Sequence, residues 1–315
     1  MLSDLDRMNS EKIIMKTKIN IKETPAMENK PIYKLLAEQK KYFKTFRDIG
    51  VKNQRAIIEN AVAFIRKELN YDVETGKCNR AVIGLSGGID SAVTFALAVR
   101  AVGAENVIGV KMPDRNVSSK KSVEYADALI AKLKVRHSYE IEIGGAVMSH
   151  ITGLRAAGYD VSDFVIGNIR ARIRMVYLFA IANQENGRVL DTCNLTERDM
   201  GYFTKYGDGA SDLNPIGELY KTWVWIIAKE LGVPEKIIKS KPSAELMGAD
   251  QTDEEDMGVG YSFLDLYLHL RRSGISKKEM TDSYMFPKEA VDMINATIAK
   301  NAHKNSMPPV CDAGF

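Results

Sequence analysis

Residues 84–91, Gly-Leu-Ser-Gly-Gly-Ile-Asp-Ser, carry side chains that could hold phosphate groups. Two adjacent glycines let a ligand approach the backbone closely, and two serine hydroxyls can form hydrogen bonds. The apolar run before this loop predicts a buried strand, and the run after it predicts a helix. The loop then lies at a helix N-terminus, where exposed N–H groups and the helix dipole favour anions. The Walker A pattern GxxxxGK[ST], with its lysine, is absent.

Asp90 is unusual in such a loop, because a carboxylate repels phosphate unless a cation lies between them. Mg²⁺ prefers one or two carboxylates together with phosphate oxygens, so we predict that Asp90 is a Mg²⁺ ligand. In the alternative interpretation, Asp90 only stabilises the start of the helix and the glycines form a turn.

The pattern SGGxDS between a buried strand and an apolar helix resembles the pyrophosphate loop of the N-type ATP pyrophosphatases, the PP-loop family. The resemblance implies an adenine nucleotide alpha hydrolase-like fold and cleavage of ATP between its α- and β-phosphates, with an adenylated intermediate. The loop would hold the leaving pyrophosphate, for which no Walker lysine is needed. The ATP contacts implied for the loop are Gly84, Leu85, Ser86, Gly87, Gly88, Ile89, Asp90 and Ser91.

Four further segments resemble NAD⁺ synthetases: Gly167–Asn183, Gly201–Thr222, Lys241–Leu246 and Gln251–Glu255. The resemblance spans roughly residues 51–310, and Tyr-Phe-Thr-Lys-Tyr-Gly-Asp-Gly-Ala-Ser-Asp-Leu-Asn-Pro is its most specific block. That family is a homodimeric amide ligase. It uses ATP and Mg²⁺ to amidate deamido-NAD⁺ with ammonia, giving NAD⁺, AMP and pyrophosphate in the last step of NAD⁺ biosynthesis.

The resemblance assigns roles to five positions near the reaction centre. Thr192, Lys221 and Ser243 match residues that contact ATP. Glu197 matches the second Mg²⁺ ligand, although alone it would be an ordinary surface carboxylate. Asp208 matches an aspartate near the nicotinate, where a carboxylate can bind ammonium and take its proton; alone it would be an Asp-Gly turn.

A second group of positions matches contacts to deamido-NAD⁺. It consists of Arg172, Lys205, Asp212, His303 and Lys304.

The sequence also departs from the family pattern at two positions. Asp191 replaces the usual glycine before the threonine, so we expect a carboxylate that crowds or repels the nucleotide. Asn305 replaces the arginine of His-Lys-Arg and removes a positive charge. Because both metal ligands are present, we still expect activity.

The pattern along the chain from residue 80 predicts an α/β fold, a doubly wound parallel sheet flanked by helices. Strands and helices alternate, and ligands of this class lie beyond the carboxyl ends of the strands, where the loop is placed. The predicted strands cover residues 81–85, 107–112, 139–143 and 188–191, and the predicted helices cover 91–102, 123–133 and 166–183.

We divide the chain into an N-terminal extension, residues 1–48, partly disordered or helical, and a NAD⁺ synthetase-like catalytic domain, residues 49–315. Helical spacing in residues 32–46 is predicted to end at Gly50, and a second helix follows as far as Leu69. Residues 1–45 are expected to be dispensable. Only 83 residues precede the loop, too few for an amidase domain, so free ammonia or ammonia from a partner is the expected donor.

Composition and charge limit the partners and the cellular location that the protein can have. The first 50 residues carry 11 basic and 7 acidic side chains, which leaves 33 and 34 for the rest, so a nucleic-acid surface is not indicated. Three separated cysteines and no signal peptide or membrane-length apolar run predict a cytoplasmic protein without a membrane partner. The helix at 166–183 is apolar around most of its circumference, which predicts burial on several sides, and the family resemblance implies that it lies at the interface of a homodimer. Two alternatives stay open: a GMP-synthetase-like or tRNA-modifying PP-loop enzyme, and a catalytically silent nucleotide-binding module.

Overall fold

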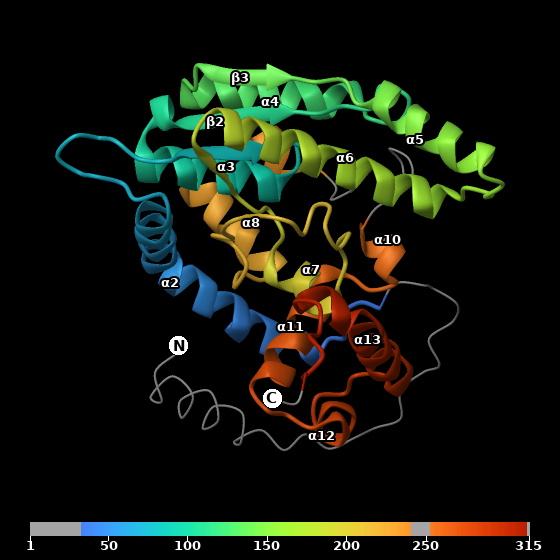
Figure 1. The fold of residues 1–315 in the computed structure, drawn as a ribbon. Coiled ribbons are helices and arrows are strands. Elements are labelled where there is room, and N and C mark those ends of the chain that lie inside the picture. The colour runs from blue at the N-terminus through green and yellow to red at the C-terminus, as the bar shows by residue number, and fades with distance from the viewer. Residues whose placement is uncertain (1–32, 241–252, 314–315) are drawn as a thin grey trace.

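The centre of the molecule is a parallel sheet, seen in a computed structural model that describes residues 33–240 and 253–313. Its strands are β1 (Arg80–Gly84), β2 (Val107–Lys111), β3 (His137–Glu140) and β4 (Gly187–Val189), in the spatial order β3-β2-β1-β4 (Figure 1). The chain leaves β1 toward β2 on one side and returns to pair β4 on the other, and β1 pairs in parallel with both. Such a reversal is where doubly wound sheets bind ligands, and the predicted fold class is confirmed.

Both faces of the sheet are covered by helices. Side chains alternate along β1: Ala81 and Ile83 belong to one core, and Val82 belongs to the other. The first core includes α2 (Gln39–Glu68), α3 (Ile89–Val102), α4 (Lys120–Leu133), α8 (Lys221–Glu230) and α9 (Glu235–Ile238). The second includes α5 (Gly144–Ala156) and α6 (Asp163–Gln184). The sheet is therefore buried on both sides, as an all-parallel sheet requires.

The predicted strands and helices of the sheet region are present, with two differences. β3 ends at Glu140, so Ile141 and Ile143 follow the strand instead of extending it. Ile143 precedes the first residue of α5, a helix that the sequence analysis did not predict. Its sequence begins with two glycines and has little amphipathic pattern, which explains why periodicity did not reveal it.

Helix α2 is one continuous helix of 30 residues, so the prediction that a helix ends at Gly50 was wrong. A Cβ on Gly50 would lie 2.8 Å from Cδ1 of Trp223, and glycine here allows α2 to approach α8 closely. The proposed boundary at residues 48/49 falls inside this helix. Upstream of it, Gln39 and Phe46 are buried, so the described part of the extension packs against the body instead of forming a loose leader.

A second helical layer lies at the end of the molecule opposite β3 and α4 (Figure 1). Its core brings together the start of α2 and the C-terminal third of the chain. Its helices are α7 (Leu195–Met200), α10 (Asp253–Met257), α11 (Tyr261–Arg272), α12 (Lys277–Asp282) and α13 (Lys288–Asn301). Two short 3₁₀ helices also occur in the described residues: η1 (Ala104–Asn106) follows α3, and η2 (Ala302–Asn305) follows α13. Within the described ranges, no helix is both long and apolar enough to span a membrane.

Candidate active site

The loop between β1 and α3 has the geometry of a phosphate cradle. Gly87 has φ +81°, and a Cβ there would lie 2.2 Å from the carbonyl oxygen of Ser122, so only glycine fits. Ser86 Oγ accepts a hydrogen bond from Gly88 N at 3.1 Å, and Ser91 Oγ donates to Gly88 O at 3.0 Å. These bonds hold the loop against the first turn of α3, whose N–H groups have no intrahelical acceptors.

Lys221 connects the two predicted metal ligands. Its Nζ lies 2.5 Å from Asp90 Oδ2 and 3.1 Å from Glu197 Oε1. The lysine side chain is only 2% exposed, and those of Asp90 and Glu197 are 16% and 14% exposed. Asp90 is thus paired with a buried ammonium, and its Oδ1 accepts a further bond from Asn194 Nδ2 at 3.0 Å. The interpretation of Asp90 as no more than a helix cap does not account for these contacts.

The short helix α7 places Glu197 through a capping box. Asn194 Oδ1 accepts from Glu197 N, and Glu197 Oε2 accepts from Asn194 N, so both ends of the motif are hydrogen-bonded. This arrangement satisfies two backbone donors at the start of the helix. Because Asn194 also donates to Asp90, one side chain sets the positions of both carboxylates.

Lys221 is the first residue of α8, and its backbone is fixed by a buried network. Thr196 Oγ1 accepts from Lys221 N at 3.0 Å and donates to Asp265 Oδ1 at 2.6 Å. Asp265 Oδ2 accepts from Thr222 N at 2.7 Å. Burial raises the pKa of Asp265 to about 6, although these hydrogen bonds act in the opposite direction. The network links α7, α8 and α11 behind the lysine.

The electrostatics of this cluster are dominated by burial and by the excess of carboxylates. Burial and the carboxylate of Asp90 raise the pKa of Glu197, and Lys221 opposes them. Burial alone would lower the pKa of Lys221, but Asp90, Glu197 and Asp253 together raise it well above its ordinary value. The lysine is therefore charged at every relevant pH and balances part of the negative charge around it.

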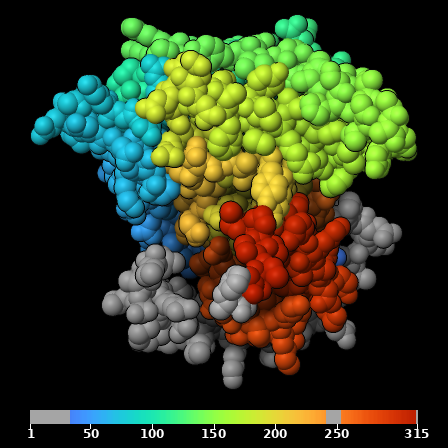
Figure 2. All heavy atoms as spheres, in the orientation of Figure 1, coloured from blue at the N-terminus to red at the C-terminus, as the bar shows by residue number. Residues whose placement is uncertain are grey.

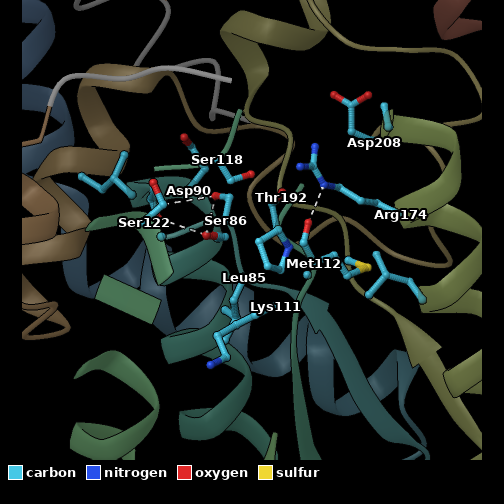
Figure 3. Close-up of a pocket in the computed structure, with 18 of the residues that line it drawn as sticks. Leu85, Ser86, Asp90, Lys111, Met112, Ser118, Ser122, Arg174, Thr192 and Asp208 are labelled. Atoms are coloured by element: carbon cyan, nitrogen blue, oxygen red, sulfur yellow. Dashed lines mark hydrogen bonds between the residues drawn. The ribbon is translucent and has the colours of Figure 1, made fainter. Parts of the chain in front are cut away.

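A cavity of about 530 Å³ joins the loop to a second group of polar residues. Figure 3 shows Ser86 and Asp90 on one side of it, Arg174 and Asp208 on the other, and Thr192 between them. Arg174 extends from α6, and its Nε donates to Met112 O at 3.1 Å, which fixes the guanidinium over the cavity. Because the same cavity is lined by the loop and by Asp208, two different reactive groups can meet within it.

Asp208 lines this cavity, and the residue is exposed to solvent there. Loss of surrounding water raises its pKa, while a hydrogen bond from Thr204 N to its Oδ1, at 2.8 Å, and the charge of Arg174 lower it. Thr204 Oγ1 in turn donates to Asn168 Oδ1 on α6 at 2.8 Å. The carboxylate is thus held by its own loop, and Thr204 ties that loop to α6.

Four of the five residues expected to contact the second substrate come together, but beside the cavity and not in its lining. Arg172 donates to Lys205 O at 3.3 Å, and Lys205 Nζ donates to His303 O at 2.6 Å. Lys304 Nζ donates to Gly201 O at 2.7 Å and to Phe203 O at 2.9 Å. These bonds tie the C-terminal segment to the loop after α7, and Figure 2 shows the red C-terminal segment against the yellow part of the chain.

The remaining sequence-predicted residues are placed as follows. Asp212 lies apart from the other four, where its Oδ2 accepts from Val189 N at 2.7 Å beside the end of β4. Ser243 lies outside the described residues. Asp191 lines the cavity, but its carboxylate accepts from Cys193 N at 2.8 Å and from Ser211 Oγ at 3.3 Å. Its oxygens are engaged within the protein, which weakens the expectation that they crowd a nucleotide.

Several cavity residues were not predicted from the sequence. Arg174, Tyr202 and Asp253 all line the site. Arg174 and Asp253 lie inside segments that carried the family resemblance, and Tyr202 lies in its most specific block, so their location in those blocks was the available signal. Nothing in their spacing indicated that they face the cavity. Asp253 is 5% exposed, and its Oδ1 has no hydrogen-bond partner in the described structure.

The sheet, the loop at its switch point and the helix that follows define an α/β protein of the PP-loop ATP pyrophosphatase class. The family model described as NAD synthase matches residues 57–308, and the chain belongs to this family.

Comparison with individual proteins agrees with that membership. The chain is 38% identical to the NH₃-dependent NAD⁺ synthetase of Methanosarcina mazei over 257 residues, which are 80% of this chain and 98% of that protein. It is 41% identical to the enzyme of the same name from Pyrococcus horikoshii, covering 80% of this chain and 92% of that one. Among solved structures, an NMN synthetase from Francisella tularensis is similar with a TM-score of 0.70 and 32% identity, over 82% of this chain and 98% of that one. The NH₃-dependent NAD synthetase from Campylobacter jejuni has a TM-score of 0.67 and 29% identity, over 82% and 99% of the two chains.

Proposed function

We propose that this protein amidates deamido-NAD⁺ with ammonia and ATP to give NAD⁺, AMP and pyrophosphate. The observation that carries the proposal is the single cavity that joins a phosphate-binding loop, with Asp90, Glu197 and Lys221, to Asp208 and Arg174 at its other side. An enzyme that first adenylates a carboxylate and then amidates it needs both groups within one site. The names of the similar proteins support the same reaction.

A divalent cation fits the loop end of this site. Asp90 and Glu197 supply two carboxylates, and within the described part of the chain no three His, Cys, Asp or Glu side chains are arranged to hold a metal ion. Two carboxylates plus nucleotide oxygens is the ligand set that Mg²⁺ favours over an all-protein site. We infer that Asp90 and Glu197 hold Mg²⁺ together with ATP, where the ion would neutralise charge on the phosphates.

Different residues of the site serve the two steps of the reaction, adenylation and amidation. The first-turn N–H groups of α3 and the loop glycines bind the pyrophosphate part of ATP, while the nicotinate carboxylate oxygen attacks the α-phosphorus and pyrophosphate leaves. Ammonium then binds Asp208, which accepts a proton, and the resulting ammonia attacks the acyl carbon. AMP leaves, and the nitrogen gives up its second proton to water as the carboxamide forms. We infer that Arg174 holds an oxygen of the nicotinate carboxylate near Asp208, and its charge opposes the burial that raises the pKa of that aspartate.

Assembly and location belong to the same proposal. Helix α6 leaves three large apolar side chains exposed in the single chain, those of Phe164, Val165 and Val176. We infer a homodimer with two-fold symmetry through this helix, which light scattering can test. The three cysteines Cys78, Cys193 and Cys311 are all free, which suits a reducing cytoplasm.

The decisive experiment incubates the purified protein with deamido-NAD⁺, ATP, Mg²⁺ and ammonium and measures NAD⁺ and the products of ATP cleavage. NAD⁺, AMP and pyrophosphate should form in equal amounts. ADP and orthophosphate in their place would rule out the proposed cleavage of ATP. Nicotinate mononucleotide should be tested in parallel, because one structural relative is named an NMN synthetase.

A matched pair of variants assigns the chemistry to the site. Asp90→Asn should nearly abolish turnover, because it removes a carboxylate from the proposed metal site and leaves Lys221 with one partner fewer. Asp292→Asn removes an aspartate of an exposed i,i+4 ion pair with Lys288 and should leave the rate unchanged. Equal rates for both variants would show that Asp90 does not take part.

A further inference from the structure

The site contains a buried carboxylate to which the reaction above gives no task. Asp253, at the start of α10, is 5% exposed and lines the cavity. Its Oδ2 accepts a hydrogen bond from Tyr261 Oη at 3.0 Å, whereas its Oδ1 has no partner among the described residues. A buried carboxylate oxygen without a partner is costly, and it is kept where something occupies it for part of the time.

Lys221 is linked to Asp253 through Tyr261 and through the electrostatic interaction of the two charges. Its Nζ lies 5.1 Å from the centre of the Tyr261 ring, and the hydroxyl of that ring is bonded to Asp253. The two groups also interact through space, since the Asp253 charge raises the pKa of Lys221. Tyr261 therefore contacts both groups, the ammonium through its ring face and the carboxylate through its hydroxyl, and the ring offers the ammonium a favourable cation–π contact.

Lys221 now occupies the place that a divalent cation needs. Its Nζ is within 3.1 Å of one oxygen of Asp90 and one of Glu197, so a second cation bound to those same oxygens would meet strong repulsion at short range. The lysine side chain is enclosed, at 2% exposure, and cannot simply turn into water. A buried charge that loses its partners needs others.

We propose that Asp253 is a positioning residue for Lys221: its free carboxylate oxygen takes the Lys221 ammonium when a divalent cation takes Asp90 and Glu197. This inference rests on the proposed metal site. It makes the lysine a charged side chain with two positions, one that neutralises the empty carboxylate pair and one that clears it. In the protein without nucleotide, Asp253 is the acceptor that the described structure provides for the second position.

The test measures Mn²⁺ binding to the full-length, nucleotide-free protein by electron paramagnetic resonance, so it does not depend on turnover. Asp253→Asn should weaken Mn²⁺ binding by roughly two- to a hundredfold, the range spanned by interaction energies between neighbouring groups. Asp256→Asn is the control. Asp256 lies three residues further along the same short helix and accepts a hydrogen bond from Tyr202 Oη, and its loss of charge should change Mn²⁺ binding less than twofold. Equal affinities of wild type and Asp253→Asn, including no measurable binding by either, overturn the proposal.

A second comparison shows whether Asp253 acts through the lysine. Lys221→Met should bind Mn²⁺ more tightly than wild type, because the competing ammonium is gone. In that background Asp253→Asn should have much less effect than in wild type. The same loss in both backgrounds would mean that Asp253 acts on the metal directly, and would overturn the positioning role.

Two further variants separate charge from structure and cover the case in which Lys221→Met does not fold. Tyr261→Phe breaks the bond to Asp253 but keeps the carboxylate, so it should retain Mn²⁺ affinity; a loss equal to that of Asp253→Asn would indicate a structural role only. Asp253→Glu keeps the charge and should recover much of the affinity lost in Asp253→Asn, and no recovery counts against the proposal. Asp90→Asn and Glu197→Gln test the metal site itself. If they bind Mn²⁺ as wild type does, the proposed metal ligands are wrong, whatever Asp253 does.

Discussion

Asp191→Asn should change how the stability of the protein depends on pH. The carboxylate is 8% exposed, and it accepts hydrogen bonds from Cys193 N and Ser211 Oγ. An asparagine has the same shape and can still accept the bond from Cys193 N through its amide oxygen. The substitution therefore removes the ionisable group with little change in packing.

The magnitude follows from the pKa of this group. Burial is the main cause that raises the pKa of Asp191 from 3.8 to about 6, and the nearby charge of Asp208 adds to it, against the hydrogen bonds. Between about pH 4 and pH 6 the folded protein therefore binds more protons than the unfolded chain, so wild-type stability falls as pH rises through this window. One pKa unit corresponds to about 1.4 kcal/mol, and the full effect is about 3 kcal/mol. Below pH 4 the penalty is absent, and above about pH 7 it is constant.

Urea unfolding of both proteins from pH 3.5 to pH 8, at one protein concentration, measures this effect. The free energy of unfolding of Asp191→Asn relative to wild type should rise by about 3 kcal/mol between pH 4 and pH 7 and then level off. Asp265, whose pKa is also raised to about 6, is present in both proteins, so its contribution cancels in the difference. A difference that is independent of pH, or that falls as pH rises, would refute the reasoning.

Three other substitutions probe the loop, the second helical layer and the reaction. Gly87→Ala should destabilise the protein by at least about 1–2 kcal/mol, because φ is +81° and the Cβ meets the Ser122 carbonyl. It should also abolish nucleotide binding, as measured by calorimetry. Gly145→Ala is the control, since the space around its Cβ is open. Phe46→Ala should lower the free energy of unfolding by about 3–5 kcal/mol in urea, since Phe46 is 2% exposed. Asp208→Asn should slow NAD⁺ formation by about 10²–10⁴-fold and raise the ammonium requirement while pyrophosphate release continues in a first turnover. Wild-type rates at low ammonium would exclude Asp208 as the ammonium site.

The expectation that residues 1–45 are dispensable changes with the structure. Residues 33–45 include the buried Gln39, whose Nε2 donates to Tyr284 O at 3.2 Å, and Tyr42, whose ring lies 5.1 Å from that of Tyr284. A truncation that begins at Asp48 would remove these contacts together with Phe46. The sequence alone could not reveal this, because Tyr33, Tyr42 and Phe46 pack against rings more than 170 residues away, those of Phe263, Tyr284 and Tyr220.

The sheet and the loop could be predicted because their signals are local. Continuous apolar runs marked β1 and β2 to within one residue, and the glycines marked the turn that leads into α3. Gly50 shows where local signals fail. It was interpreted as the end of a helix, yet the helix continues, because packing against Trp223 requires a residue without a side chain. Tertiary contact overrides helix propensity at this position.

The positions of the charged groups were harder to predict. Lys205 and Lys304 were expected to meet the second substrate, but their ammonium groups bind backbone carbonyls of the protein itself. A lysine that satisfies carbonyls and a lysine that awaits an anion have the same sequence signature. Whether these bonds open when substrate arrives depends on the relative free energy of the two arrangements, which spacing along the chain does not encode.

The missing Walker lysine is a second case in which the sequence did not show where an ammonium group lies. The loop at Gly84–Ser91 has no cation of its own, but Lys221, which is 131 residues after Asp90, reaches it from the start of α8. This lysine is bound to carboxylates, and Asp265 and Thr196 fix its backbone behind the site. A loop lysine would always face the phosphates. A lysine from another helix, close to carboxylates, can neutralise the site before the nucleotide and its metal bind, and it can move aside afterwards. A lysine within the loop could not move in this way without disturbing the phosphate cradle.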